Sequence, residues 1–242
     1  YISSIEYSSF QKNFLKTLKS VNNNYDYFFF CDQDDIWEKE KIEISLDFLN
    51  RDFTVPSLIC SRTKIIDENG KAKGFSPKFD RPPSLRNSLV QSIAGGNTMG
   101  FNLQTKILLD QIKDLNNVVS HDWTTYLLVT LFEGEIYYSK KPYVKYRNHS
   151  KNKIGSNNGL FPKIERIQKL LRGDFKEWND KNLNLASEFN LPRNSEKIVQ
   201  DFIDMRNSNI IQRIRKFFKI GIYRQRWLSN IALLISLVIK KL

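Results

Sequence analysis

Three aspartates fall within four positions, directly after a short apolar segment. Asp32, Asp34 and Asp35 follow residues 25–31, a run that is apolar and aromatic apart from Asp26. Crowded carboxylates repel one another unless a cation lies between them. Oxygen ligands favour a hard ion such as Mg²⁺ or Mn²⁺. Such an ion can hold a diphosphate and neutralise the charge that grows on it as it leaves.

The position of this acidic cluster favours a binding site over a solvated turn. Asp32 and Asp34 are two residues apart, so in an extended chain both side chains face the same way. Ligands in open α/β sheets bind just beyond the carboxyl ends of strands. An EF-hand loop starting at Asp32 is excluded, because its fifth and sixth positions are Ile36 and Trp37 instead of an oxygen ligand and a glycine.

The elements around the cluster predict an α/β domain followed by a helical extension. Residues 25–31 are short and rich in Phe and Tyr, which is typical of a parallel strand buried on both faces. Helical spacing precedes this strand at 10–18 and follows it at 38–49. Further strands are expected at residues 57–61, 100–103, 135–139 and 143–147. Beyond the Gly- and Asn-rich segment 155–159 the pattern is helical only.

The segment from Asp32 to Trp37, Asp-Gln-Asp-Asp-Ile-Trp, resembles the signature of family 2 glycosyltransferases of the GT-A fold. It is closest to the branch that includes bacterial rhamnosyltransferases. The resemblance implies a GT-A-like, Rossmann-like mixed sheet flanked by helices. It implies that Asp32 lies near the ribose and diphosphate, that Asp34 binds the metal together with Asp32, and that Asp35 shapes the sugar pocket.

Three later segments resemble the same family in the same order. Gly95 and Gly96 would border the sugar and acceptor sites, since glycines let the backbone approach a ligand closely. Asp122 would be the catalytic base that deprotonates the acceptor hydroxyl. Arg147 would balance phosphate charge, and His149 would complete the metal shell or contact the diphosphate. An ordinary loop and a helix cap are the simpler explanations for the glycines and for Asp122.

The resemblance spans about residues 10–155 and lacks the family's first strand and helix, which clasp the nucleotide base. We therefore expect residues 1–155 to form a partial GT-A domain and residues 156–242 to form a helical extension. Cys31 and Cys60 are too few for a disulfide framework and are expected to be reduced core residues. Reduced cysteines fit a cytosolic compartment.

The basic charge of the chain is concentrated at its C-terminal end. The net charge is +12, yet nine basic and no acidic residues follow Asp204. Residues 210–219 mix an apolar stripe with Arg and Lys, and residues 227–239 are mostly apolar but shorter than the roughly 20 residues that a spanning helix needs. This pattern is typical of a helix on an anionic membrane surface, and a helix packed on the catalytic domain explains it equally well. No nucleic acid is expected as a partner, because neither a matching motif nor a basic body surface is evident.

Together these features predict an inverting glycosyltransferase of bacterial surface polysaccharide synthesis that depends on Mg²⁺ or Mn²⁺. It would move a sugar from a nucleotide-sugar donor to a saccharide or lipid-linked saccharide, in the cytoplasm at the inner face of the plasma membrane. The closest resemblance makes dTDP-rhamnose the expected donor. The alternative is an inactive remnant, or a membrane-associated binding module, left by truncation.

Overall fold

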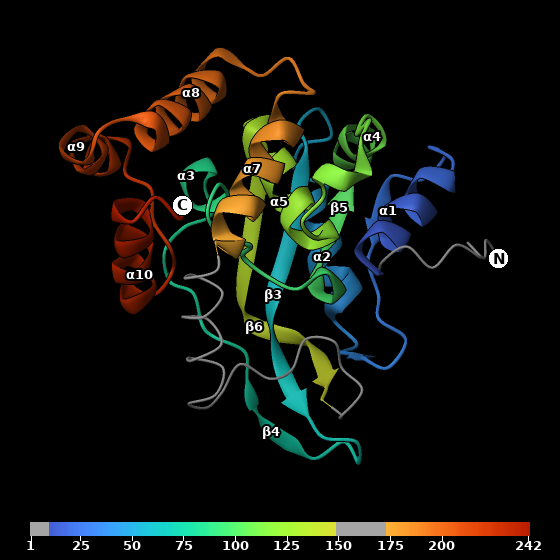
Figure 1. The fold of residues 1–242 in the computed structure, drawn as a ribbon. Helices are drawn as coiled ribbons and strands as arrows, with labels where there is room; N and C mark the ends of the chain where they lie inside the picture. Colours follow the sequence, from blue (N-terminus) through green and yellow to red (C-terminus); the bar gives the residue numbers. More distant parts are fainter. Residues whose placement is uncertain (1–9, 149–172) are drawn as a thin grey trace.

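The computed structural model describes residues 10–148 and 173–242. They form an α/β domain followed by C-terminal helices, as the sequence predicts (Figure 1). The strands are β1 (Tyr27–Phe29), β2 (Ile36–Trp37), β3 (Ser57–Ile66), β4 (Ala72–Phe75), β5 (Gly100–Asn102) and β6 (Glu135–Arg147). The helices are α1 (Phe10–Ser20), α2 (Lys41–Leu49), α3 (Leu85–Ser88), α4 (Leu103–Asp110), α5 (His121–Leu131), α7 (Asp174–Ala186), α8 (Arg193–Asn207), α9 (Ile210–Ile220) and α10 (Trp227–Val238).

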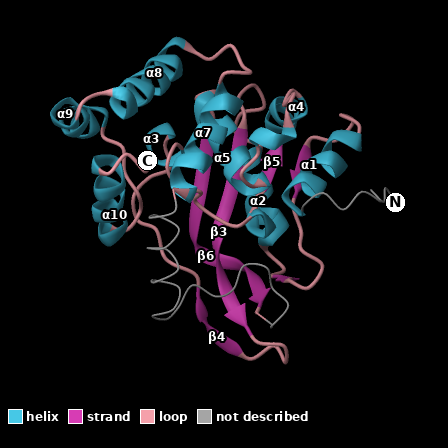
Figure 2. Ribbon diagram, in the orientation of Figure 1, coloured by secondary structure: helices cyan, strands magenta, loops and turns pink. Residues whose placement is uncertain are grey.

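The strands form one mixed, curled sheet in the order β1-β5-β3-β6-β2, with β4 paired to β3. Its centre is a long parallel pair, β3 and β6, and the other pairings are antiparallel. Figure 2 shows helices gathered around the upper part of the sheet, while β4 and the far ends of β3 and β6 extend below them. This mixed sheet with flanking helices is the predicted GT-A-like fold class.

Helix α5 is the central helix of the core. Ten of its eleven residues are buried, and it contacts β3, β6, α3, α4 and α7. Its sequence is apolar on every side after the first turn, as expected of a helix that is covered all round. Ser120 fixes where it begins, because the serine side chain accepts a hydrogen bond from the Trp123 N–H. The core therefore holds the first turn of α5, with Asp122, in a fixed place.

Two strand predictions were wrong in their details. Strand β1 covers only Tyr27–Phe29, pairs antiparallel with β5 and stands at the end of the strand order. Only Phe28 of β1 is buried, because the chain alternates between two faces instead of being covered on both. The two strands expected at 135–139 and 143–147 form one strand, β6, whose pairing with β3 shifts register near Pro142, a residue without an N–H to donate.

The two cysteines differ in their surroundings. Both are free, but Cys60 is buried on β3, whereas Cys31 is exposed. The expectation of a core position was therefore wrong for Cys31. The apolar run continues to this residue, but the chain has already left the sheet at Phe30, so the thiol faces the loop that follows.

The C-terminal helices continue the same hydrophobic core. Leu185 of α7, Phe202 of α8 and Leu237 of α10 belong to one buried cluster with residues of the α/β part. Trp178 of α7 packs edge-on against Trp123 of α5, with 6.1 Å between ring centres. The predicted boundary between residues 155 and 156 lies outside the described residues. In the described ranges, no helix is both long and apolar enough to span a bilayer.

Candidate active site

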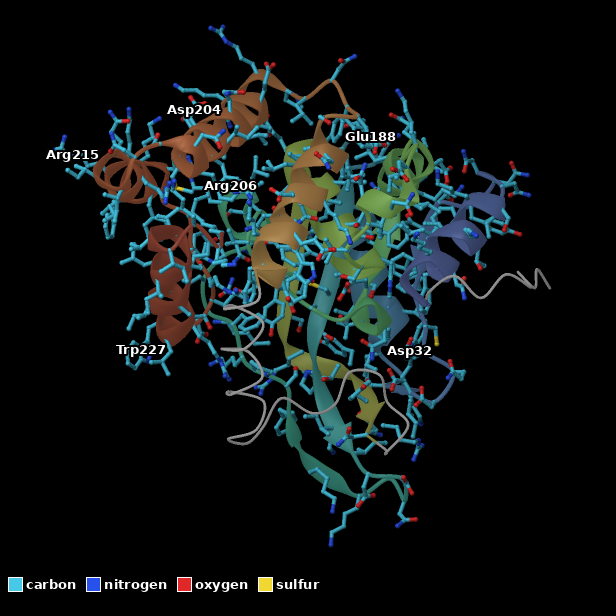
Figure 3. All side chains as sticks on the ribbon, in the orientation of Figure 1. Asp32, Glu188, Asp204, Arg206, Arg215 and Trp227 are labelled. Carbon is cyan, nitrogen blue, oxygen red and sulfur yellow. The ribbon has the colours of Figure 1, made fainter. Side chains whose placement is uncertain are left out.

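The acidic cluster lies in the loop between β1 and β2. Figure 3 shows Asp32 at the lower right of the molecule, in this loop beyond the end of β1. Asp32, Asp34 and Asp35 are all partly buried, so their carboxylates face a half-covered surface instead of bulk water. The sequence thus located the cluster correctly at the tip of a strand.

Asp35 is held by partners from two distant segments. Its carboxylate accepts hydrogen bonds from the Asn97 side-chain amide and, at 3.1 Å, from the backbone N–H of Arg147. The Arg147 guanidinium in turn donates to the carbonyl of Asp34 at 3.0 Å and to the carbonyl of Glu68 at 2.7 Å. Asp35 and Arg147 therefore fix the path of the acidic loop. The predicted contact of Arg147 with phosphate stays a prediction.

Asp122 lies close enough to the acidic loop for its charge to act on Asp32. The pKa of Asp32 is raised to about 6, first by burial and then by the negative charges of Asp35, Asp34 and Asp122. Burial also raises the pKa of Asp35, against its hydrogen bonds to Asn97 and Arg147. Three aspartates from two separate elements thus lie close enough to Asp32 to disfavour its charged form, and a cation beside Asp32 would relieve this repulsion.

Asp122 occupies the first turn of α5, where negative charge is favoured by the helix dipole. Its carboxylate accepts a hydrogen bond from the neighbouring Trp123 N–H at 2.8 Å. This contact shows that Asp122 does help to cap the helix. The side chain is only partly buried, so capping leaves it accessible to a substrate.

The glycine segment has a packing role that the sequence did not indicate. A Cβ atom on Gly96 would overlap the imidazole of His121. His121 is buried, stacked on Phe14 at 4.2 Å between ring centres and edge-on to Phe30 at 4.9 Å. Burial lowers its pKa, which favours the neutral ring. Gly96 therefore lets the start of α5 lie against the loop before β5, whereas Gly95 is exposed.

Lys41 is a residue of this region that the sequence reading missed. It is the first residue of α2 and only 2% exposed. Its ammonium donates to the carbonyl of Thr98 at 3.2 Å and lies 4.5 Å from the centre of the Trp37 ring. Burial lowers its pKa to about 8. Nothing in the local sequence separates it from the neighbouring Lys39, because its partners Trp37 and Thr98 lie outside α2.

The described residues supply two of the three expected metal ligands, Asp32 and Asp34. Within these residues, no group of three or more His, Cys, Asp or Glu side chains is placed to hold a metal ion. His149, the third expected ligand, lies outside them. Mg²⁺ is commonly held by one or two carboxylates together with substrate phosphates. The two carboxylates are donors of the kind that such an ion takes, and metal binding stays a prediction.

The curled mixed sheet with flanking helices, and the acidic loop beyond a strand, define a GT-A-like α/β protein. No family model matches the chain. The chain is similar to the dTDP-rhamnosyl transferase RfbG of Shigella flexneri, with 27% identity over 64% of this chain and 55% of that protein. It thus spans about half the length of the curated relative it matches. This similarity supports a relationship to glycosyltransferases.

Proposed function

We propose that the chain carries the catalytic site of an inverting glycosyltransferase in bacterial surface polysaccharide synthesis. It moves a sugar from a nucleotide-diphosphate donor to a saccharide or lipid-linked saccharide. The observation that supports this proposal is the position of Asp122, at the start of α5, close enough to the acidic loop for its charge, with those of Asp35 and Asp34, to raise the pKa of Asp32. The similarity to a dTDP-rhamnosyl transferase makes dTDP-rhamnose the first donor to test.

The proposed roles follow from where the aspartates lie, in the acidic loop and in the first turn of α5. Asp122 takes the proton of the acceptor hydroxyl while that oxygen attacks the anomeric carbon, and the bond to the diphosphate breaks on the opposite face of the sugar. Asp32 and Asp34, with His149 as the expected third ligand, would hold Mg²⁺ or Mn²⁺, which supplies positive charge to the leaving diphosphate. Asp35 shapes the sugar pocket from its fixed position beside Asn97.

The remaining residues keep this arrangement in place before the substrate arrives. Arg147 joins the acidic loop to the end of β6 through backbone contacts at both Asp34 and Asp35. Such preorganisation matters because a site whose supporting contacts are loose loses much of its rate. Gly95, exposed beside Asn97, is the point at which a sugar could approach the backbone most closely.

We further propose that the protein works in the cytoplasm, peripherally at the inner face of the plasma membrane, where lipid-linked saccharides are extended. A second candidate function is a membrane-associated binding module without transferase activity. The observation that favours it is the group of exposed apolar side chains on the last two helices, among them Trp227 and Phe218. The two candidates differ in whether the chain turns over a donor.

The deciding experiment is turnover of dTDP-rhamnose by the purified chain, with and without Mn²⁺, followed as release of dTDP. We expect Mn²⁺-dependent release that Asp34→Ala abolishes, because one of two carboxylate ligands is lost. Asp47→Ala, at an exposed aspartate of α2, is the matched control and should behave as wild type. Turnover unchanged in Asp34→Ala would overturn the metal assignment. Donor binding without turnover would favour the second candidate.

A further inference from the structure

Large exposed apolar side chains are concentrated on the last two helices. Of the fourteen such side chains among the described residues, eight lie between Ile210 and Ile239. Trp227 is 71% exposed, Phe218 67% and Ile211 63%. The others are Ile210, Leu228, Ile231, Ile235 and Ile239. Scattered exposed apolar residues are normal, but a contiguous patch marks an interaction site.

Helix α10 is apolar on two opposite faces. Leu233, Ser236 and Leu237 are buried against the protein. Trp227, Ile231 and Ile235, spaced at four residues, are exposed on the other side. No charged residue occurs between Trp227 and Val238. A helix that is apolar all round is normally covered all round, so the outer face of α10 requires a partner.

This outer face is held rigidly. Arg213, which is 2% exposed, donates from α9 to the carbonyl of Leu237 at 2.9 Å. The side chain of Asn230 accepts from the backbone N–H of Arg224 and donates to its carbonyl, each at 2.7 Å. Helix α10 therefore cannot turn its outer residues inward without breaking these hydrogen bonds. These contacts keep the apolar face of α10 turned towards the outside of the protein.

Exposed basic residues lie on α9 and at the two ends of α10, on the helices that carry the apolar side chains. Arg215, Lys219, Arg226 and Lys240 are exposed on or beside α9 and α10. No acidic residue follows Asp204 to balance them. Figure 3 shows Arg215 and Trp227 on the same side of the molecule. Basic residues close to an anionic lipid surface are attracted to it.

We propose that α9 and α10 form a docking surface for an anionic phospholipid bilayer. Trp227, Ile231 and Ile235 enter the boundary between headgroups and acyl chains, while the basic residues contact the headgroups. Helix α10 has 12 residues and is about 18 Å long, which is too short to span a bilayer but suits a helix lying in its surface.

Charge favours a membrane over a second copy of the chain as the occupant. A two-fold contact brings the same patch of both copies together. Arg215, Lys219 and Arg226 would then face their own counterparts, with no acid on the tail to pair with them. An anionic bilayer complements both the apolar face and the basic residues on the same helices. The proposal rests on the membrane location that is part of the proposed function, but it involves none of the proposed catalytic residues. A loss of vesicle binding can therefore be distinguished from a loss of sugar transfer.

The test is co-sedimentation of the full chain with vesicles of phosphatidylglycerol and phosphatidylcholine, compared with phosphatidylcholine alone. We expect binding to the anionic vesicles that is weakened by 0.5 M NaCl. Replacing Trp227, Ile231 and Ile235 by Ser should lower the affinity at least tenfold in low and high salt. Arg215→Glu combined with Lys219→Glu should lower it at least tenfold in low salt only. Phe53→Ser, at an apolar residue that is 52% exposed elsewhere, is the matched control.

Fluorescence of Trp227 tests the geometry without a multiple substitution. Its emission should shift to the blue when anionic vesicles are added, and Trp227→Phe should lose this shift while still binding. Unchanged binding by the triple Ser variant would overturn the proposal. So would concentration-dependent dimerisation of wild type, with no vesicle binding, that the same variant abolishes, because the surface would then be covered by a second copy.

Discussion

At the scale of single residues, Asp32 is destabilising while it is charged. Its pKa rises from 3.8 unfolded to about 6 in the folded chain. The stability that the proton gives is full below pH 4 and is lost as pH rises to about 6. The free energy of unfolding of Asp32→Asn minus that of wild type should therefore be about 1 kcal/mol larger at pH 7.5 than at pH 4, after discounting for partial exposure. Urea unfolding at both pH values measures this, and an equal gain at both would contradict it. Asp47→Asn is the control.

The titration of Lys41 affects stability in the opposite direction, because it stabilises the folded chain as pH rises. Its pKa falls from 10.5 unfolded to about 8 folded, chiefly through burial. The neutral amine is the form that burial favours, so wild type gains stability as pH rises from 8 towards 10.5. Lys41→Met lacks this gain. The stability of wild type minus that of Lys41→Met should increase by up to about 3 kcal/mol over this range. A flat difference in urea unfolding, with exposed Lys39→Met as the matched control, would show that the ammonium is solvated.

Substitution of Asp122 distinguishes a catalytic role from a role in capping the helix. Asp122→Asn keeps an oxygen that can accept the Trp123 N–H, so thermal stability should stay close to wild type. The loss of the base should lower kcat/KM for the acceptor by about 10²- to 10⁴-fold. Steady-state transfer kinetics and a thermal melt of the same preparation measure both. A large fall in melting temperature with unchanged kcat/KM per folded molecule would reduce Asp122 to a helix cap.

At the scale of elements, the contact between the loop before β5 and the start of α5 depends on Gly96. Gly96→Ala places a methyl group into His121, which is fixed between Phe14 and Phe30. We expect a loss of about 1–3 kcal/mol, typical of overpacking. Gly95→Ala should lose less, because its methyl group meets only the tip of the Asn97 side chain. Urea unfolding of the two variants provides the comparison, and equal losses would contradict it.

Local pattern was sufficient for most elements and insufficient for their pairing. Helical spacing predicted α1 and α2, and the apolar run predicted β1. The same run was expected to be parallel and covered on both faces, but its neighbour is β5, about seventy residues further along the chain. Pairing is a non-local property, and a three-residue strand leaves little local signal to decide it. The exposed position of Cys31 is a result of the same early end to β1.

The candidate site, too, was predicted where its residues are local in sequence and not where its contacts are distant. The acidic cluster is contiguous in sequence and was found there. The contacts that fix it are not contiguous, since Arg147 reaches Asp34 across 113 positions and Asn97 reaches Asp35 across 62. Lys41 was missed because its partners, Thr98 and Trp37, come from separate segments of the chain. Sequence therefore identified the acidic cluster and named Arg147, but it did not indicate the contacts by which Arg147 and Asn97 position the loop.

At the scale of the whole molecule, the C-terminal helices complete the core instead of forming a separate unit. Leu185, Phe202 and Leu237 share one buried cluster with Leu127 of α5. Ending the chain after residue 148 removes them and exposes apolar surface of α5. We expect this shortened chain to lose its near-ultraviolet circular dichroism and to aggregate. A soluble shortened chain with the melting temperature of wild type would instead support two independent domains.

Figure 3 places Asp32 on one side of the molecule and Trp227 on the other. A protein seated through Trp227 would keep the proposed donor site turned to the water, where a soluble nucleotide-sugar reaches it by three-dimensional diffusion. The bound protein itself would diffuse only laterally, along the membrane surface. Only an acceptor whose glycan protrudes past the bilayer surface can meet that site, so the reach of the growing glycan would select which carriers are extended.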